Sequence, residues 1–169
     1  QSFLQAGLPT HLGGKNAGIV FADCDMDKAI EGTLRSAFAN CGQVCLGTER
    51  VYVQRPIFDE FVARLKAGAE QLVLGPPDDA TSNFGPLISL KHREKVLSYY
   101  QKAVEDGATV ITGGGVPDMP AELAHGAWVQ PTIWTGLKDD SAVVTEEIFG
   151  PCCHIRPFDS EEEAVALAN

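Results

Sequence analysis

Short runs rich in apolar and β-branched residues alternate along the chain with longer runs in which apolar residues recur every three or four positions. The short runs are typical of strands and the longer period is typical of helices. The predicted strands are residues 16–21, 50–54, 109–112, 127–134 and 152–157. The predicted helices are residues 26–39, 56–72, 89–105 and a last one that begins after residue 160. This alternation predicts an α/β fold, a largely parallel sheet flanked by helices.

Local signals refine the helices and strands. The face of helix 56–72 that is expected to turn inward carries Phe58, Phe61, Val62, Leu65, Ala69 and Leu72. The inward face of helix 89–105 is expected to carry Val96, Leu97, Tyr100 and Val104. Pro131 has no N–H to donate, so it places strand 127–134 at a sheet edge or at a break. Ser160 followed three residues later by Glu163 is a capping box that starts the last helix.

Composition and charge narrow the range of functions. The 169 residues are 44% hydrophobic, which is enough for a packed core. Lys and Arg number 13 against 23 Asp and Glu, a formal charge of −10 that would repel a nucleic-acid backbone. The apolar runs are far shorter than the ~20 residues that cross a bilayer, and residues 1–9 lack a secretory pattern. We therefore expect neither a nucleic-acid partner nor a membrane partner.

Five cysteines stand at irregular positions, namely Cys24, Cys41, Cys45, Cys152 and Cys153. An odd number without a regular spacing argues against a disulfide framework and favours a reducing compartment, so we expect a cytoplasmic protein. Metal sites of the tetrahedral type usually combine two short spacings of ligands. The chain offers no such combination, and we expect no metal.

The run FANCGQVCLG, residues 38–47, is the most informative for chemistry. A helix is expected to end near Gly42, and the chain then turns and presents Cys45 just before a strand. An accessible thiolate is a good nucleophile, so Cys45 is a candidate catalytic residue. Cys41 is the competing candidate. The alternative for both is a small buried apolar side chain, the common fate of a free cysteine.

Four motifs occur in an order and at separations that resemble the aldehyde dehydrogenase superfamily. They are HLGGKN (11–16), GQVC (42–45), Gly85 with Pro86, and EEIFGP (146–151). Residues 21–53 and 145–164 look most like the 2-aminomuconic and 2-hydroxymuconic 6-semialdehyde dehydrogenases. The resemblance implies NAD-dependent oxidation of a muconic-type semialdehyde to the acid, through a thiohemiacetal and a thioester on cysteine.

The resemblance also implies roles for single residues. Cys45 matches the nucleophile, and its backbone N–H would help to hold the oxyanion. Glu147 matches a carboxylate that binds the nicotinamide ribose of NAD, and Phe149 matches a ring beside the nicotinamide. Gly13 would let the backbone lie against the cofactor, and His92 falls where some relatives contact the cofactor ribose. Taken alone, Glu147 would be a solvated carboxylate, Phe149 a core residue and His92 a surface residue.

His11 departs from the family pattern, which has a glutamate general base at this position. A neutral imidazole with an ordinary pKa near ~6.5 can act as a base at neutral pH. The other explanation is that residues 1–11 are an atypical segment derived from a truncated or mis-joined start, in which case His11 has no catalytic meaning. We favour the second explanation, because the mismatch covers the whole segment.

The resemblance further implies that residues 12–169 are part of a catalytic domain truncated at both ends, with the Rossmann-like cofactor domain elsewhere. A full-length parent is expected to be a homo-oligomer, and the fragment is expected to be inactive alone. Two other hypotheses stay open. The first is a non-catalytic domain with the dehydrogenase fold, and the second is a cofactor-independent thiol esterase.

Overall fold

The computed structural model describes residues 13–169 of the chain. Its strands are β1 (Asn16–Val20), β2 (Thr48–Gln54), β3 (Thr109–Thr112), β4 (Thr132–Thr135) and β5 (Cys152–Phe158). Its α-helices are α1 (Met26–Phe38), α2 (Phe58–Glu70), α3 (Leu90–Glu105), α4 (Ala142–Thr145) and α5 (Glu161–Ala168). Two short 3₁₀ helices are η1 (Ala39–Gly42) and η2 (Arg55–Ile57).

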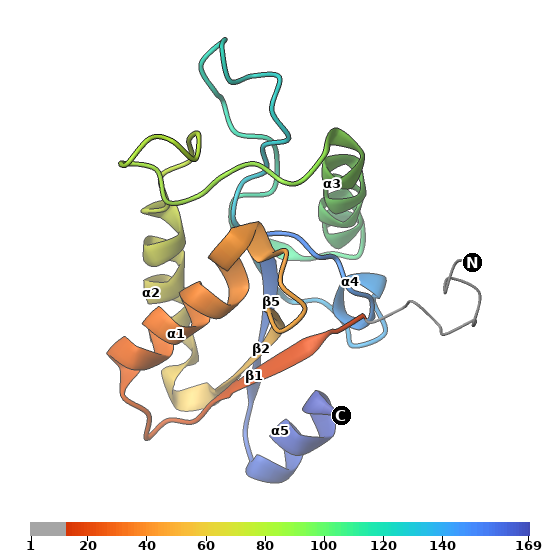
Figure 1. Cartoon of the computed structure of the whole chain (residues 1–169). Coiled ribbons are helices and arrows are strands. Elements are labelled where there is room, and N and C mark those ends of the chain that lie inside the picture. Colours follow the sequence, from red (N-terminus) through yellow and green to blue (C-terminus); the bar gives the residue numbers. More distant parts are fainter. Residues whose placement is uncertain (1–12) are drawn as a thin grey trace, which may run out of the picture.

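The five strands form one sheet in the order β1-β2-β5-β4-β3 (Figure 1). β1, β2, β5 and β4 run parallel, and β3 runs antiparallel to β4 at one edge. The prediction of a largely parallel sheet flanked by helices is thus confirmed. Parallel strands place their equivalent ends at the same edge of the sheet. The turn before β1 and the turns before β2 and β5 therefore lie close to one another.

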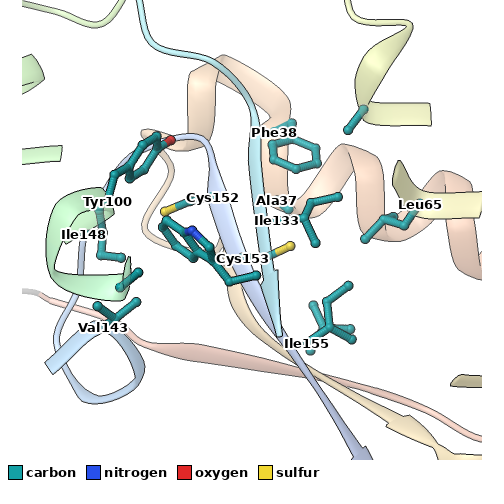
Figure 2. Close-up of a cluster of buried hydrophobic side chains, with 14 of the residues drawn as sticks. Ala37, Phe38, Leu65, Tyr100, Ile133, Val143, Ile148, Cys152, Cys153 and Ile155 are labelled. Atoms are coloured by element: carbon teal, nitrogen blue, oxygen red, sulfur yellow. The ribbon is translucent and has the colours of Figure 1, made fainter. Parts of the chain in front are cut away.

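Helices cover both faces of the sheet. Along β2, Val51 and Val53 join the main core with α1 and α2, whereas Tyr52 joins a smaller cluster with α5 on the other face. Figure 2 shows the same alternation on β5, where Cys152 is directed toward Tyr100 and Cys153 toward the opposite side. This alternation is the period of two expected for a strand that is buried on both faces.

Helix starts follow the signals in the sequence. The side chains of Asp25 and Ser89 accept the backbone N–H of the residue three positions on, which caps α1 and α3. The serine half of the predicted capping box of α5 is confirmed, because Ser160 Oγ accepts the Glu163 N–H at 3.3 Å. Glu163 Oε2 reaches back to the N–H of Asp159 at 2.7 Å.

Three of the expectations were wrong in detail. The strand expected at 127–134 is β4 at 132–135, since Pro131 ends the pairing and the residues before it form no strand. Val104 is 59% exposed, and its neighbour Ala103 faces the core instead. Leu72 lies beyond α2, which ends at Glu70. Within residues 13–169, no helix is long and apolar enough to cross a membrane.

Candidate active site

A tight left-handed turn follows α1 and leads to the candidate nucleophile. Asn40, Cys41 and Gly42 all have positive φ, at 50°, 58° and 70°. A Cβ on Gly42 would lie 2.0 Å from the carbonyl oxygen of Gly150, so only glycine fits at that position. The turn therefore packs directly on the backbone of the EEIFGP loop, which precedes β5.

The two candidate nucleophiles are in opposite environments. Cys41 is buried, and its thiol donates a hydrogen bond to the Gly85 carbonyl oxygen at 3.1 Å. This burial raises the pKa of Cys41, which disfavours its thiolate. Cys45 is exposed. The structure therefore favours Cys45 over Cys41 as the accessible thiol.

The turn before β1 joins the cysteine loop to the EEIFGP loop. Asn16 Nδ2 donates to the carbonyl oxygens of Cys45 and Gly47, at 2.7 and 3.0 Å. The Gly14 N–H donates to Glu147 Oε1 at 2.9 Å. A Cβ on Gly14 would lie 3.1 Å from the Cys45 carbonyl oxygen. Gly14 thus binds the Glu147 carboxylate and has no room for a side chain beside the cysteine loop.

The EEIFGP loop (residues 146–151) carries Glu147 and Phe149. Phe149 has a φ of 62°, a left-handed conformation that is rare for a bulky residue and marks local strain. A Cβ on Gly150 would lie 2.7 Å from the side chain of Val96 on α3, so the loop lies close against that helix. Glu147 and Phe149 are both half-buried.

Side chains of helix α3 form hydrogen bonds with two carbonyl groups of the same loop. His92 Nε2 lies 2.6 Å from the Phe149 carbonyl oxygen. A carbonyl oxygen only accepts hydrogen bonds, so Nε2 is protonated and donates the hydrogen bond. Lys95 Nζ donates to the carbonyl oxygen of Glu147 at 3.1 Å. The His92 and Phe149 rings are also in edge contact, with centroids 6.1 Å apart.

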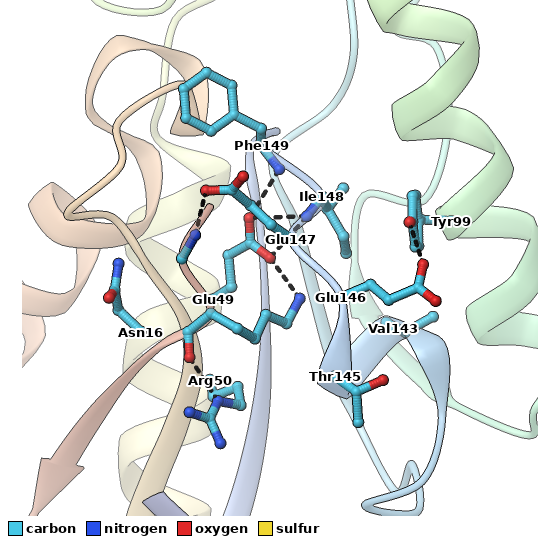
Figure 3. Close-up of polar contacts among 12 residues, drawn as sticks. Asn16, Glu49, Arg50, Tyr99, Val143, Thr145, Glu146, Glu147, Ile148 and Phe149 are labelled. Atoms are coloured by element: carbon cyan, nitrogen blue, oxygen red, sulfur yellow. Dashed lines mark hydrogen bonds and ion pairs between the residues drawn. The ribbon is translucent and has the colours of Figure 1, made fainter. Parts of the chain in front are cut away.

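A carboxylate on β2 accepts hydrogen bonds from two N–H groups of the same loop. Glu49 is only 7% exposed and accepts the N–H of Ile148 at 3.1 Å and the N–H of Phe149 at 2.8 Å. Lys15, from the turn before β1, forms an ion pair with the same carboxylate. Figure 3 shows Glu49 beneath the loop, between β2 and the backbone of Ile148 and Phe149.

An open hollow of about 660 Å³ lies beside Glu147. Its lining combines side-chain-free backbone with charged groups and comprises Gly13, Gly14, Lys15, Lys95, Tyr99, Thr145, Glu146 and Glu147. A Cβ on Gly13 would stand 3.4 Å from Glu147 Oε2. An ordered carboxylate beside bare backbone suits a ligand that presents hydroxyl groups, such as a ribose.

The structure places Gly13 near the Glu147 carboxylate and joins His92 to Phe149 by a hydrogen bond. It links the backbone of Cys45 to the same region through Asn16 and Gly14. His11 lies outside the described residues. His92 is half-buried and bonds to Phe149, so it is not a simple surface residue. Its contact with the cofactor ribose stays a prediction.

Sequence reasoning missed the roles of Lys15, Asn16, Glu49 and Lys95. Lys15 and Asn16 belong to the first motif, and that could have drawn attention to them. Glu49 stands two residues before Val51 and four before Val53, so the alternation of the strand already placed it on the inward face.

Comparisons with known proteins agree with this geometry. Residues 7–169 match the aldehyde dehydrogenase family. The chain belongs to the aldehyde dehydrogenase family. The family match thus begins a few residues before the HLGGKN motif (11–16).

Two curated relatives of the chain are named for muconic semialdehydes. The chain is 86% identical to 2-hydroxymuconic semialdehyde dehydrogenase of Pseudomonas putida, over 94% of the chain and 32% of that protein. It is 54% identical to 2-aminomuconic 6-semialdehyde dehydrogenase of a Pseudomonas species, over the same shares. The chain therefore spans about a third of the length of these relatives.

Solved aldehyde dehydrogenases have the same fold. Betaine aldehyde dehydrogenase of Staphylococcus aureus, in complex with NAD⁺, superposes with a TM-score of 0.90 at 38% identity. The match covers 93% of the chain and 31% of that enzyme. Other structures of the same enzyme contain a cysteine modified by β-mercaptoethanol.

Proposed function

We propose that residues 12–169 form part of the catalytic domain of an NAD⁺-dependent dehydrogenase that oxidises 2-hydroxymuconic semialdehyde to the carboxylic acid. One observation carries this proposal. The exposed Cys45 follows a turn that packs on the loop of Glu147 and Phe149. Gly14 donates to the Glu147 carboxylate and has no room for a side chain beside the Cys45 carbonyl. A nucleophile beside a carboxylate that can bind a ribose is the arrangement that aldehyde oxidation needs.

Cys45 acts as the nucleophile in the proposed reaction. Its thiolate adds to the aldehyde carbon and forms a thiohemiacetal, while the carbonyl oxygen becomes an oxyanion held by the Cys45 N–H. Loss of hydride from that carbon leaves a thioester on Cys45. Attack by water on the thioester then releases the carboxylic acid and regenerates the thiolate. Asn16 holds the Cys45 carbonyl and so fixes the orientation of this loop.

Glu147, Phe149 and Gly13 fit the nicotinamide end of NAD⁺, which when bound accepts the hydride. The Glu147 carboxylate would bind the ribose hydroxyls, while Phe149 would pack beside the ring. Gly13 has no side chain and so leaves room where its backbone lines the hollow. His92 would act on this site through the Phe149 carbonyl that it binds, in addition to any contact with the ribose. NAD⁺ is also the ligand in the structure of the Staphylococcus aureus enzyme.

The substrate assignment rests on graded identity. Identity falls from 86% with a 2-hydroxymuconic enzyme to 54% with a 2-aminomuconic enzyme and to 44% with betaine aldehyde dehydrogenase of Rhizobium johnstonii. This order favours the 2-hydroxy substrate over the 2-amino substrate. We further propose a cytoplasmic homo-oligomer as the assembled form, as the sequence analysis expects.

The chain matches only about a third of the length of its relatives, so the proposal is tested in a chimera. In this chimera, residues 12–169 replace the corresponding segment of the 2-hydroxymuconic semialdehyde dehydrogenase of Pseudomonas putida. We expect the chimera to form NADH from 2-hydroxymuconic semialdehyde and to use betaine aldehyde poorly. Cys45→Ala should abolish NADH formation, whereas the control Cys24→Ser should preserve it. Turnover that survives in Cys45→Ala would remove this residue from the mechanism.

The alternative is a non-catalytic domain with the same fold, and thiol labelling separates the two. In the chimera, iodoacetamide should modify Cys45 well ahead of the other cysteines of residues 12–169. Burial raises the pKa of Cys152 and raises the pKa of Cys153 to about 12, so neither should compete. Equal labelling of Cys45 and the half-buried Cys24 would favour the non-catalytic alternative.

A further inference from the structure

The conformation of the EEIFGP loop needs support from its surroundings. Phe149 sits at a φ of 62°, and such strained residues persist only where neighbouring groups hold them. The loop also has to present Glu147 and Phe149 together, on either side of Ile148. A small rotation of this backbone would reorient both side chains, including Glu147, which lines the hollow.

Glu49 supplies that support on the N–H side of the loop. Its carboxylate accepts from two successive N–H groups, those of Ile148 and Phe149, at 3.1 and 2.8 Å. Successive N–H groups that converge on an anion form a nest, a recurring way to fix a tight backbone turn. In this protein the anion is a side chain of the rigid strand β2, four residues after Cys45.

Two further side chains, Lys15 and His92, stabilise Glu49 and the loop. Lys15 pairs with the Glu49 carboxylate, which is largely buried, so little water is available to offset its charge. His92 donates to the Phe149 carbonyl on the opposite side of the same residue. Both polar backbone groups of Phe149 are thus held, one from β2 and one from α3.

We propose that Glu49 is a positioning residue for the cofactor-facing loop, acting through the N–H groups of Ile148 and Phe149, with Lys15 as its charge partner. The proposal rests on the proposed function, because it assigns the loop to NAD⁺. Glu49 does not line the hollow beside Glu147 and acts only through the loop backbone that it binds. Its effect should therefore fall on NAD⁺ and hydride transfer, and should spare the reactivity of the Cys45 thiol.

Glu49→Gln is the sharp probe, since glutamine has nearly the same size. A carboxylate accepts from all three donors around it, whereas an amide turns an NH₂ group toward at least one of them. Glu49→Ala removes every acceptor. Ser160→Ala is the matched control, because it weakens the start of α5, far from the loop, and lowers stability by loss of a cap.

Three quantities are measured in the chimera for each variant: the Kd of NAD⁺ by calorimetry, kcat and KM for NADH formation, and the rate of Cys45 alkylation without NAD⁺. Glu49→Gln should raise the Kd of NAD⁺ or lower kcat/KM about tenfold or more, as expected for a lost charge-assisted hydrogen bond. Alkylation should stay within about twofold of the parent. Ser160→Ala should leave all three unchanged.

Two results would overturn the role of Glu49. The first is unchanged NAD⁺ binding and kcat/KM in a folded Glu49→Ala variant. The second is a parallel loss of alkylation, binding and turnover, which would indicate general structural support. A parent chimera that binds NAD⁺ but forms no NADH would contradict the proposed function alone, and the Kd would then decide the role of Glu49.

Discussion

Gly42→Ala tests the contact between the cysteine turn and the cofactor-facing loop. The new methyl group would lie 2.0 Å from the Gly150 carbonyl oxygen, far inside van der Waals contact. That oxygen already accepts the Cys152 N–H at 2.8 Å, so the loop cannot shift without loss of a hydrogen bond that starts β5. Gly150 directly follows Phe149, and any relief of the clash would move the cofactor-facing loop.

The magnitude follows from two contributions. The left-handed conformation destabilises an alanine by about 1–2 kcal/mol. Alanine also lowers the conformational entropy of the unfolded chain, which offsets part of this destabilisation. Overpacking against a fixed backbone adds about 1–3 kcal/mol. Gly107→Ala is the matched control, because Gly107 has a φ of 89° and no atom within 4 Å of its added Cβ. It isolates the conformational contribution.

We expect Gly42→Ala to destabilise the chimera by about 2–4 kcal/mol and Gly107→Ala by about 1 kcal/mol. Urea unfolding compares the two midpoints with that of the parent. Gly42→Ala should also slow NADH formation under conditions where it remains folded, whereas Gly107→Ala should not. Equal midpoints for the two variants would refute the close contact between Gly42 and Gly150 and the coupling derived from it.

Two further predictions concern histidines. Burial lowers the pKa of His154 to about 4, against about 6.5 in an unfolded chain, so the unfolded chain binds the proton first as the pH falls. The free energy of unfolding should keep its full value above pH ~6.5 and fall by about 3 kcal/mol toward pH ~4. In His154→Gln, urea unfolding should show a free energy that depends less on pH over this range, and an unchanged pH dependence would contradict this. Introducing His11 into the chimera, which otherwise keeps the residue of its Pseudomonas parent before Leu12, should preserve the first turnover of NADH. It should slow later turnovers about 10²–10⁴-fold, because the thioester then lacks its base; equal steady-state rates would show that His11 replaces it.

Much of the fold could be predicted because its signals are local. The period of apolar positions in α1 and α3, and the cap at Ser160, depend on residues within a few positions of one another. The same holds for the exposed Cys45, since a helix end near Gly42 and a following strand leave little cover between them. The errors arose where packing decides. The inward face of α3 includes Ala103 in place of Val104, and this depends on the elements against which the helix lies.

The sequence by itself determined the α/β alternation and the family, and its GQVC motif singled out Cys45 as a candidate nucleophile. Each of these depends on periodicity or on contiguous motifs. Only the tertiary structure decided how these motifs meet. Glu49 and Ile148 are 99 residues apart in the chain, and Gly14 and Glu147 are 133 apart. A carboxylate that stabilises a distant loop has the same local pattern as one that faces water, because its role depends on which N–H groups folding brings within reach.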